Sequence, residues 1–212
     1  MAKHKKRVSI LIDGSNFYHR LKELKIKNQL QLDFSGFVKF LAGKDKLVRS
    51  CYYVGAIRTQ KNNPKSMKLY INQRKLFSSL EKQNIKIYRG YILKTDGWHE
   101  KGVDVKLAID ILIGAYENLY DKAIIVSSDT DLLPAINKAV SLKKTIQYVG
   151  FSHKPSFALI RHAQPARLLT ADDILPFIKK WIFDFQGSSA SLADLNPITI
   201  ELKPANKQYL SC

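Results

Sequence analysis

The order of apolar and polar residues predicts strands that alternate with helices along most of the chain. Val8 to Ile12 is a short β-branched run of the kind that is buried on both faces of a parallel sheet. By the same pattern, strands are expected at residues 8–12, 47–57, 85–93, 123–126 and 145–149. Apolar residues at helical spacing predict helices at residues 16–26, 34–41, 66–83, 103–119, 131–142, 156–162 and 172–183.

This alternation predicts an α/β fold, in which about five parallel strands form one sheet with helices on both faces. In the helix expected at residues 66–83, Leu69, Gln73, Leu76 and Leu80 fall on one side. From about Gln186 the composition changes to Gly, Ser, Ala, Asn and Pro. We therefore expect one domain over residues 1–183 and an extended or disordered tail over residues 184–212.

Charge is the unusual feature of the composition. The formal net charge is +17 and the pI is near 9.8, a balance that favours polyanionic partners, nucleic acid first and anionic membrane second. From residue 184 onward, acidic residues outnumber basic ones, so the positive excess lies in the predicted domain.

The cysteines and the apolar runs argue against a disulfide-rich, zinc-binding, secreted or membrane-spanning protein. Two cysteines make no disulfide framework, and the five histidines form no zinc-site pattern. The opening apolar run ends at Asp13 and is too short for a signal peptide. No run approaches the roughly 20 residues of a membrane helix, so we expect a cytoplasmic protein without membrane insertion.

Aspartates follow two of the expected strands directly. In VSILIDGSN, Asp13 ends the first strand, Gly14 permits a sharp turn, and Ser15 or Asn16 could cap the next helix. In AIIVSSDTDLL, Asp129 and Asp131 follow the fourth strand across a short polar turn. The carboxyl ends of parallel strands are where such sheets bind ligands.

A third motif, KGVDVKLAIDILI, places Asp104 near the start of an apolar helix. Buried carboxylates cost several kcal/mol unless they are paired or bind a cation. If the first and fourth strands are neighbours, Asp13 and Asp129 converge. An oxygen-rich site of this kind suits Mg²⁺ or Mn²⁺, which could activate water for attack on a phosphodiester.

Together these three motifs, with IQYVGF after them, resemble the NYN domain family, and more narrowly its LabA-like branch, over roughly residues 7–170. The resemblance implies a three-layer α/β/α PIN-like fold with strand order 3-2-1-4-5. It also implies a metal-dependent nuclease acting mostly on RNA. Carried over by position, its acidic site falls on Asp13, Asp104, Asp129 and Asp131, with Asn16 as a polar helper. Of these, Asp13, Asp104 and Asp129 are expected to hold the metal, directly or through water.

The sequence departs from the family pattern in a few places. Ser128 and Leu132 replace a glycine and an aromatic residue that are frequent in the third motif. The additional acid that PIN nucleases carry on the helix before strand three has no clear match, since Glu81 lies at the far end of that helix. A regulator that binds RNA or DNA without cutting it is therefore the alternative function.

Each aspartate also has a simpler structural explanation. Asp13 could accept backbone N–H groups of the following turn, and Asp129 or Asp131 could cap the next helix. Asp104 could face the positive end of its helix dipole. Asp110 lies four residues after Lys106, so an ion pair within the helix explains it better than a catalytic role does.

Basic and hydroxyl side chains near these motifs are candidates for phosphate contact. A run of basic residues is usually only a solvated surface, yet the overall charge favours nucleic acid here. The candidates are Arg58, Lys61, Lys65, Lys68, Arg74, Lys101, Ser127 and Ser128. The expected partner is RNA, or DNA in the alternative, and the sequence leaves a homodimer open.

Overall fold

A computed structural model describes residues 5–26, 29–57, 63–94, 98–178, 182–183 and 189–190. The chain divides into two compact units, Met1–Ile178 and Lys179–Cys212. Within the second unit, the described residues form a short antiparallel pair of strands, β8 (Ile182–Phe183) and β9 (Ser189–Ala190). The domain boundary expected at residue 183 stays a prediction.

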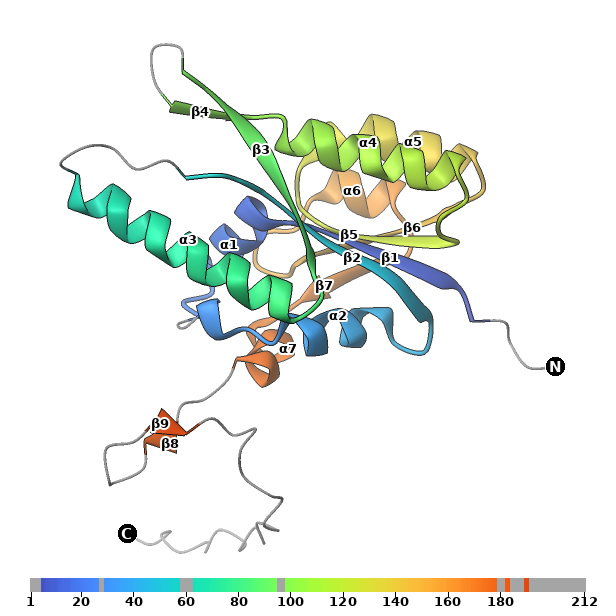
Figure 1. The fold of residues 1–212 in the computed structure, drawn as a ribbon. Coiled ribbons are helices and arrows are strands. Elements are labelled where there is room, and N and C mark those ends of the chain that lie inside the picture. Colours follow the sequence, from blue (N-terminus) through green and yellow to red (C-terminus); the bar gives the residue numbers. More distant parts are fainter. Residues whose placement is uncertain are drawn as a thin grey trace, which may run out of the picture. The chain divides into compact units, whose positions relative to one another are not determined.

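One sheet runs through the first unit (Figure 1). Its strands are β1 (Arg7–Asp13), β2 (Lys46–Gly55), β3 (Lys86–Lys94), β4 (Trp98–Lys101), β5 (Lys122–Val126), β6 (Thr145–Phe151) and β7 (Ala166–Leu169). Their order is β4-β3-β2-β1-β5-β6-β7, and every pairing is parallel except that of β3 with β4. Counted over the parallel strands alone, the order is 3-2-1-4-5-6. The predicted order 3-2-1-4-5 is confirmed, with one further strand at the edge.

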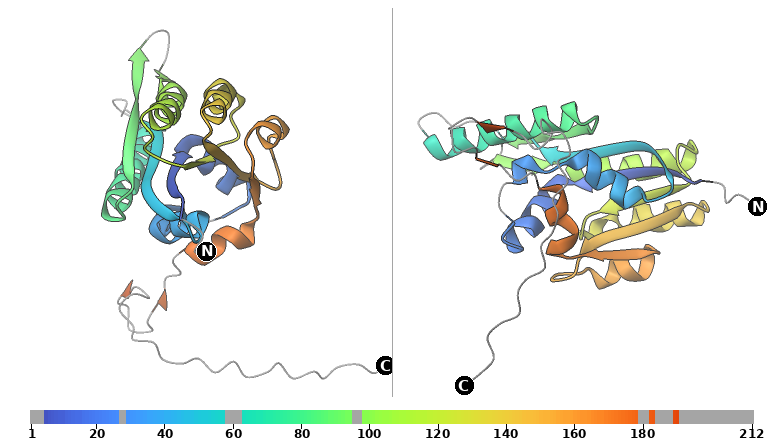
Figure 2. Two further views of the ribbon diagram at one scale, coloured as in Figure 1. Left: turned by 90° about the vertical axis from the view of Figure 1, so that its right-hand side faces the viewer. Right: turned by 90° about the horizontal axis from the view of Figure 1, so that it is seen from below.

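Helices cover both faces of this sheet (Figure 2). One face is covered by α4, α5 and α6, and the other by α1, α2, α3 and α7. Their bounds are α1 (Gly14–Glu23), α2 (Phe34–Ala42), α3 (Pro64–Lys82), α4 (Val103–Tyr116), α5 (Leu133–Ser141), α6 (Phe157–His162) and α7 (Ala171–Ile174). Three 3₁₀ turns lie between them, η1 (Gln29–Gln31), η2 (Thr130–Leu132) and η3 (Leu175–Phe177). The predicted three-layer α/β architecture is thus confirmed.

Alternation along the strands divides the buried side chains between two apolar cores. On β1, Ile10 and Ile12 pack into the core beneath α1, α2 and α3, whereas Leu11 packs into the core beneath α4 and α5. Successive side chains of a strand point to opposite faces. Asp13 therefore shares the face of Leu11 and points toward the α4 side.

Two short strands of the large sheet were not predicted. β7 has a mixed burial pattern and lies at an edge, so it lacks the continuous apolar run that marks a central strand. β4 is a four-residue polar segment, WHEK, whose pairing with β3 is antiparallel. Neither the apolar pattern nor the helix–strand alternation indicates such strands.

The helix predicted over residues 172–183 is wrong for most of its length. α7 ends at Ile174, η3 follows, and Ile182–Phe183 forms strand β8. Pro176 explains the end of the helix, because proline has no N–H to continue the helical hydrogen bonds. Among the residues that the structure describes, no helix is both long and apolar enough to cross a membrane.

Candidate active site at the carboxyl ends of the strands

Asp13 ends β1 and is only 4% exposed. One carboxylate oxygen accepts the backbone N–H of Asn16 at 3.0 Å, so Asp13, rather than Ser15 or Asn16, is the N-cap of α1. The other oxygen accepts the Ser127 hydroxyl at 2.7 Å. Burial raises the pKa of Asp13, these hydrogen bonds oppose the rise, and the charge of Asp129 adds to it. No lysine, arginine or histidine in the described part of the chain forms an ion pair with it.

Close packing beneath the first turn of α1 requires glycine at position 14. A Cβ atom there would lie 2.2 Å from the Tyr52 ring and 2.8 Å from the carbonyl oxygen of Tyr53. The Tyr52 hydroxyl donates to the carbonyl of Gly14 at 3.2 Å. This contact between β1 and β2 fixes where the chain turns directly after Asp13.

The turn from Ser127 to Asp129 follows β5, the neighbour of β1, and side chains hold it on several sides. The Ser127 hydroxyl joins Asp13 to the backbone N–H of Asp129, at 2.7 and 3.1 Å. Asn16 accepts the backbone N–H of Ser128 at 3.2 Å. The two strand ends are therefore joined by a connected polar network around Asp13.

Asp129 and Asp131 differ in role within this turn. Asp129 is half-buried and accepts the N–H of Asp131 at 2.9 Å, which makes it the cap of η2. Asp131 is exposed. The capping expected for one of these two residues thus belongs to Asp129, and its second carboxylate oxygen remains available for a further partner.

Asp104 reaches the same region from the first turn of α4. Gly102 precedes this helix with φ of +90°, a conformation that residues with a Cβ rarely adopt. Although Asp104 is exposed, partial burial raises its pKa, and the charges of Asp13, Asp129 and Asp131 raise it further. The four predicted aspartates therefore lie close enough to repel one another.

The donor chemistry of this cluster fits a hard divalent cation. Carboxylate oxygens that raise one another's pKa are stabilised by a bound positive charge. Across the described residues, however, no group of three His, Cys, Asp or Glu side chains is placed to hold one ion together. Mg²⁺ takes one or two direct carboxylates and keeps several waters, so Asp13 and Asp129 would suffice as direct ligands.

Asp110 is the contrasting carboxylate, on the same helix as Asp104. It is also 4% exposed, but Lys106 and Arg49 pair with it at 2.6 and 3.3 Å. The Tyr53 hydroxyl donates to it at 2.7 Å. The predicted ion pair with Lys106 is confirmed, and Asp110 lies within a structural network of α4 and the sheet.

The predicted phosphate contacts are described only in part. Arg58 and Lys61 lie outside the described residues, and of Lys101 the structure describes only the backbone, at the end of β4. Lys65, Lys68 and Arg74 are exposed on α3, and Ser127 and Ser128 lie in the turn beside Asp13. Glu81 is exposed in the last turn of α3, so it supplies no additional acid near the start of that helix.

Two features near the site gave no signal in the sequence. The Tyr148 hydroxyl lies 3.4 Å from the Ser128 hydroxyl and accepts the N–H of Ser156 at 3.1 Å, so it supports the turn from behind. A cavity also opens on the other face of the sheet, beside Gly14 and Ser15. Both depend on residues far apart in the chain, which only the fold brings together.

Comparison with known proteins identifies the fold and the family of this chain. A crystal structure of a protein of unknown function from Vibrio parahaemolyticus is similar, with a TM-score of 0.63 and 24% sequence identity over 82% of this chain and 98% of that one. No curated protein matches. The NYN domain family matches residues 7–169, which include Asp13, Asp104, Asp129 and Asp131. The chain belongs to the NYN domain family, a PIN-like nuclease family.

Proposed function

We propose that this protein is a divalent-metal-dependent ribonuclease, an endonuclease of the LabA-like branch, that hydrolyses RNA phosphodiester bonds at the Asp13 cluster. The observation that carries the proposal is a carboxylate, buried at the carboxyl end of the central strand, that has hydrogen bonds but no cationic partner among the residues that the structure describes. In a protein with a net charge of +17, an acidic cluster without a described basic partner at its centre stands out.

Each residue of the cluster has a role in this proposal. Asp13 and Asp129 hold the cation directly, while Asp104 and Asp131 act through water. Asn16 fixes the turn by accepting the N–H of Ser128, and Ser127 keeps Asp13 in position. When bound, Mg²⁺ or Mn²⁺ supplies a Lewis acid for the phosphoryl oxygen and increases the acidity of the attacking water.

Substrate binding relies on the basic surface around the cluster. Lys65, Lys68 and Arg74 on α3 are exposed, and we assign them, with Arg58, Lys61 and Lys101, to contacts with the RNA backbone. The Ser127 and Ser128 hydroxyls are assigned to the phosphate at the cut. Contacts of this kind release counterions, so RNA affinity should fall steeply with salt. Cytoplasmic RNA is the substrate pool that we propose, with no membrane partner.

The experiment is cleavage of a labelled, mixed-sequence single-stranded RNA, with EDTA, Mg²⁺ or Mn²⁺. The parent protein is compared with Asp13→Asn, Asp129→Asn and the matched control Asp172→Asn, which changes an exposed aspartate of α7 outside the cluster. We expect metal-dependent cleavage in the parent and the control. Both cluster variants should lose cleavage and retain salt-sensitive RNA binding.

Three results would count against the proposal. Cleavage that persists in EDTA contradicts the metal, and equal activity in Asp13→Asn contradicts the site. RNA or DNA binding in all four proteins, with no cleavage under any metal, favours a non-catalytic regulator. One observation favours that alternative: among the described residues, no three acidic side chains are placed to hold one metal ion together.

A further inference from the structure

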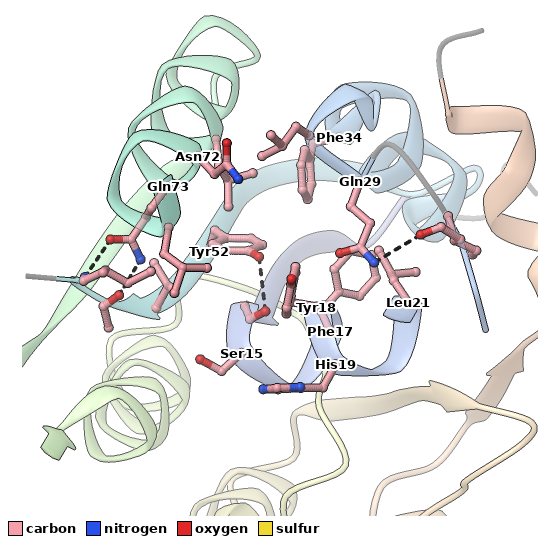
Figure 3. A pocket seen from close by; sticks show the side chains of 18 of the residues that line it. Ser15, Phe17, Tyr18, His19, Leu21, Gln29, Phe34, Tyr52, Asn72 and Gln73 are labelled. Atoms are coloured by element: carbon pink, nitrogen blue, oxygen red, sulfur yellow. Dashed lines mark hydrogen bonds between the residues drawn. The ribbon is translucent and has the colours of Figure 1, made fainter. Parts of the chain in front are cut away.

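A cavity of about 570 Å³ lies on the face of the sheet opposite the carboxylate of Asp13 (Figure 3). Its walls come from α1, η1, the end of β2 and one side of α3. Gly14 and Ser15, the two residues that follow Asp13, form the wall nearest the acidic cluster. The size is ordinary for a small-molecule site. The cavity and the proposed active site are therefore adjacent, with Gly14 and Ser15 between them.

The wall of the cavity is partly aromatic, and three of its rings, those of Phe17, Phe34 and Tyr52, are only 2% exposed. Phe17, Tyr18, Phe34 and Tyr52 all line it (Figure 3). At its rim Tyr18 is 47% exposed, and the lining residues Leu30 and Leu69 are also exposed. Exposed apolar side chains around a hollow mark a binding surface. Leu69, which was predicted on the same side of α3 as Gln73, is 46% exposed and therefore free to contact a ligand.

An unused hydrogen-bond acceptor lies in the wall. The Gln29 side chain donates from Nε2 to the carbonyl of Ile26 at 3.2 Å, which fixes the orientation of its amide. Its Oε1 is buried and has no hydrogen-bond partner within the described part of the chain, and the same holds for Oε1 of Gln31. A buried acceptor without a partner costs roughly as much as a lost hydrogen bond, so such atoms require an explanation. Figure 3 shows the oxygen of Gln29 directed into the cavity.

The neighbouring Gln73 shows how a structural glutamine differs. Its Oε1 accepts the N–H of Ile57 at 2.7 Å, and its Nε2 donates to the carbonyl of Gly55 at 2.6 Å. Both polar atoms are satisfied, and they join α3 to the end of β2. In Gln29, only the donor Nε2 has a partner. The acceptor Oε1 could therefore accept an N–H group from a ligand in the cavity.

We propose that this cavity binds a nucleobase that carries an exocyclic amino group, as part of a single-stranded RNA whose adjacent phosphate lies at the Asp13 cluster. Adenine, cytosine and guanine each present an exocyclic amino group with two N–H donors, one for each glutamine oxygen, whereas uracil offers only the single N–H of its ring N3. The exposed ring of Tyr18 at the rim provides stacking for the base, and the glutamine oxygens accept from the amino group. The placement of the cut beside the base rests on the proposed nuclease function, but base binding does not.

Two connections tie the cavity to the acidic cluster and to the RNA backbone. Ser15 lines the cavity, and the next residue, Asn16, donates its backbone N–H to Asp13 at 3.0 Å. On α3, Lys68 and Lys75 lie four residues before and three residues after Asn72, a cavity residue, so all three share one side of the helix. A base in the cavity would therefore have lysines near its backbone.

The test measures base binding without cleavage. The full chain is titrated in EDTA with adenosine, cytidine, guanosine and uridine, and binding is followed by saturation-transfer NMR. Nucleosides lack a phosphate, so neither the acidic cluster nor the basic surface contributes. We expect the three amino-bearing nucleosides to bind at least fivefold more tightly than uridine.

Two cavity variants and one control accompany the titration. Gln29→Leu removes the acceptor and should reduce binding of the amino-bearing nucleosides to the level of uridine. Asn72→Trp should fill the cavity and abolish binding of all four. Gln147→Leu makes the same change on β6, outside the cavity, and should bind as the parent does. Circular dichroism and thermal unfolding establish that each variant is folded.

Failure of this inference can be distinguished from failure of the nuclease proposal. If uridine binds as tightly as adenosine, if no nucleoside binds, or if folded Asn72→Trp binds normally, base recognition is overturned even when RNA is still cut. If nucleosides bind as expected but no RNA is cut, the nuclease proposal falls and the base site stands. When both hold, cleavage of oligouridine containing one adenosine should occur next to that adenosine, and uniform cleavage would overturn the adjacency.

Discussion

Asp13 and Asp110 are equally buried carboxylates with opposite surroundings. Each is 4% exposed, and both lie on the side of the sheet that α4 covers. Asp110 has a lysine, an arginine and a tyrosine hydroxyl within hydrogen-bond or ion-pair distance. Asp13 has a serine hydroxyl and backbone N–H groups, and its neighbouring charges are other aspartates. Asp110 therefore stabilises the packing of α4 on the sheet, whereas the Asp13 carboxylate could still bind a cation.

The comparison also explains why burial alone does not identify an active site. A buried charge that is fully paired is already stabilised, and removing its partners is what destabilises the protein. A buried charge with hydrogen bonds but no cation is kept at a cost, which a bound metal can offset. Variants of Asp13 and Asp110 should therefore differ in catalysis, in stability and in their response to metal.

The largest effect should be on catalysis. Asp13→Asn removes a metal ligand and should reduce the rate of RNA cleavage at least about 100-fold, equivalent to about 2.7 kcal/mol of activation free energy. Asp110→Asn, compared at a temperature where it is folded, should cut RNA within about fivefold of the parent. Single-turnover rates of both variants provide the measurement. An equal loss in both would break the comparison.

Stability should show the reverse order. Asp110→Asn leaves Arg49 and Lys106 without their carboxylate, and we expect the free energy of unfolding to fall by about 2 kcal/mol. This figure is below the range for fully buried pairs because Lys106 is partly exposed. Asp13→Asn should change it by less than about 1 kcal/mol, because a lost hydrogen bond is offset by a lost buried charge. Urea unfolding in EDTA measures both, and greater destabilisation by Asp13→Asn would contradict the prediction.

Divalent metal should stabilise the folded state through the acidic cluster. At ten times the dissociation constant, Mn²⁺ should add about 1.4 kcal/mol to the free energy of unfolding. The gain should be retained in Asp110→Asn and lost in Asp13→Asn and Asp129→Asn. Thermal unfolding with and without Mn²⁺ tests this independently of RNA, and a gain retained in Asp13→Asn would remove that residue from the ligand set.

The smallest effect should be a pH dependence. Because burial raises the pKa of folded Asp13 above its ordinary value of 3.8, folding favours its protonated form. The parent protein should therefore be most stable, relative to Asp13→Asn, below pH 3.8. That advantage should decline as pH rises through the folded pKa. Urea unfolding of both proteins in EDTA over a pH series measures the difference, and a difference that grows with pH would reverse the assigned sign.

Sequence alone predicted the central part of the fold well. The buried runs at Val8–Ile12 and Ala123–Val126 are continuous and β-branched, and the helices between strands have clear apolar periodicity. Burial on both faces leaves such segments few alternatives. At the edges, β4 and β7 owe their strand conformation to pairing with a neighbour, which no local pattern encodes.

The candidate site likewise has one part that the sequence predicts and one part that only the structure shows. Aspartates that directly follow buried strands are visible in the sequence, and the structure brings Asp13, Asp104, Asp129 and Asp131 into electrostatic contact. The cavity is different, because Gln29, Tyr52 and Asn72 come from three separate elements and none belongs to a motif. An unpaired acceptor such as Gln29 Oε1 can be recognised only when the atoms around it are known.

The alternation of side chains along β1 and into the following turn limits the shape of RNA that this protein could bind. Asp13 faces the α4 side, whereas Gly14 and Ser15 lead directly into the cavity on the α1 side. A strand that places a base in the cavity and its phosphate at Asp13 must bend around the edge of the sheet, with that base turned out of any stack. Rigid, fully paired helices cannot do this without opening. Unpaired loops, bulges and ends would then be cut first, and base pairing within the RNA itself would protect the rest.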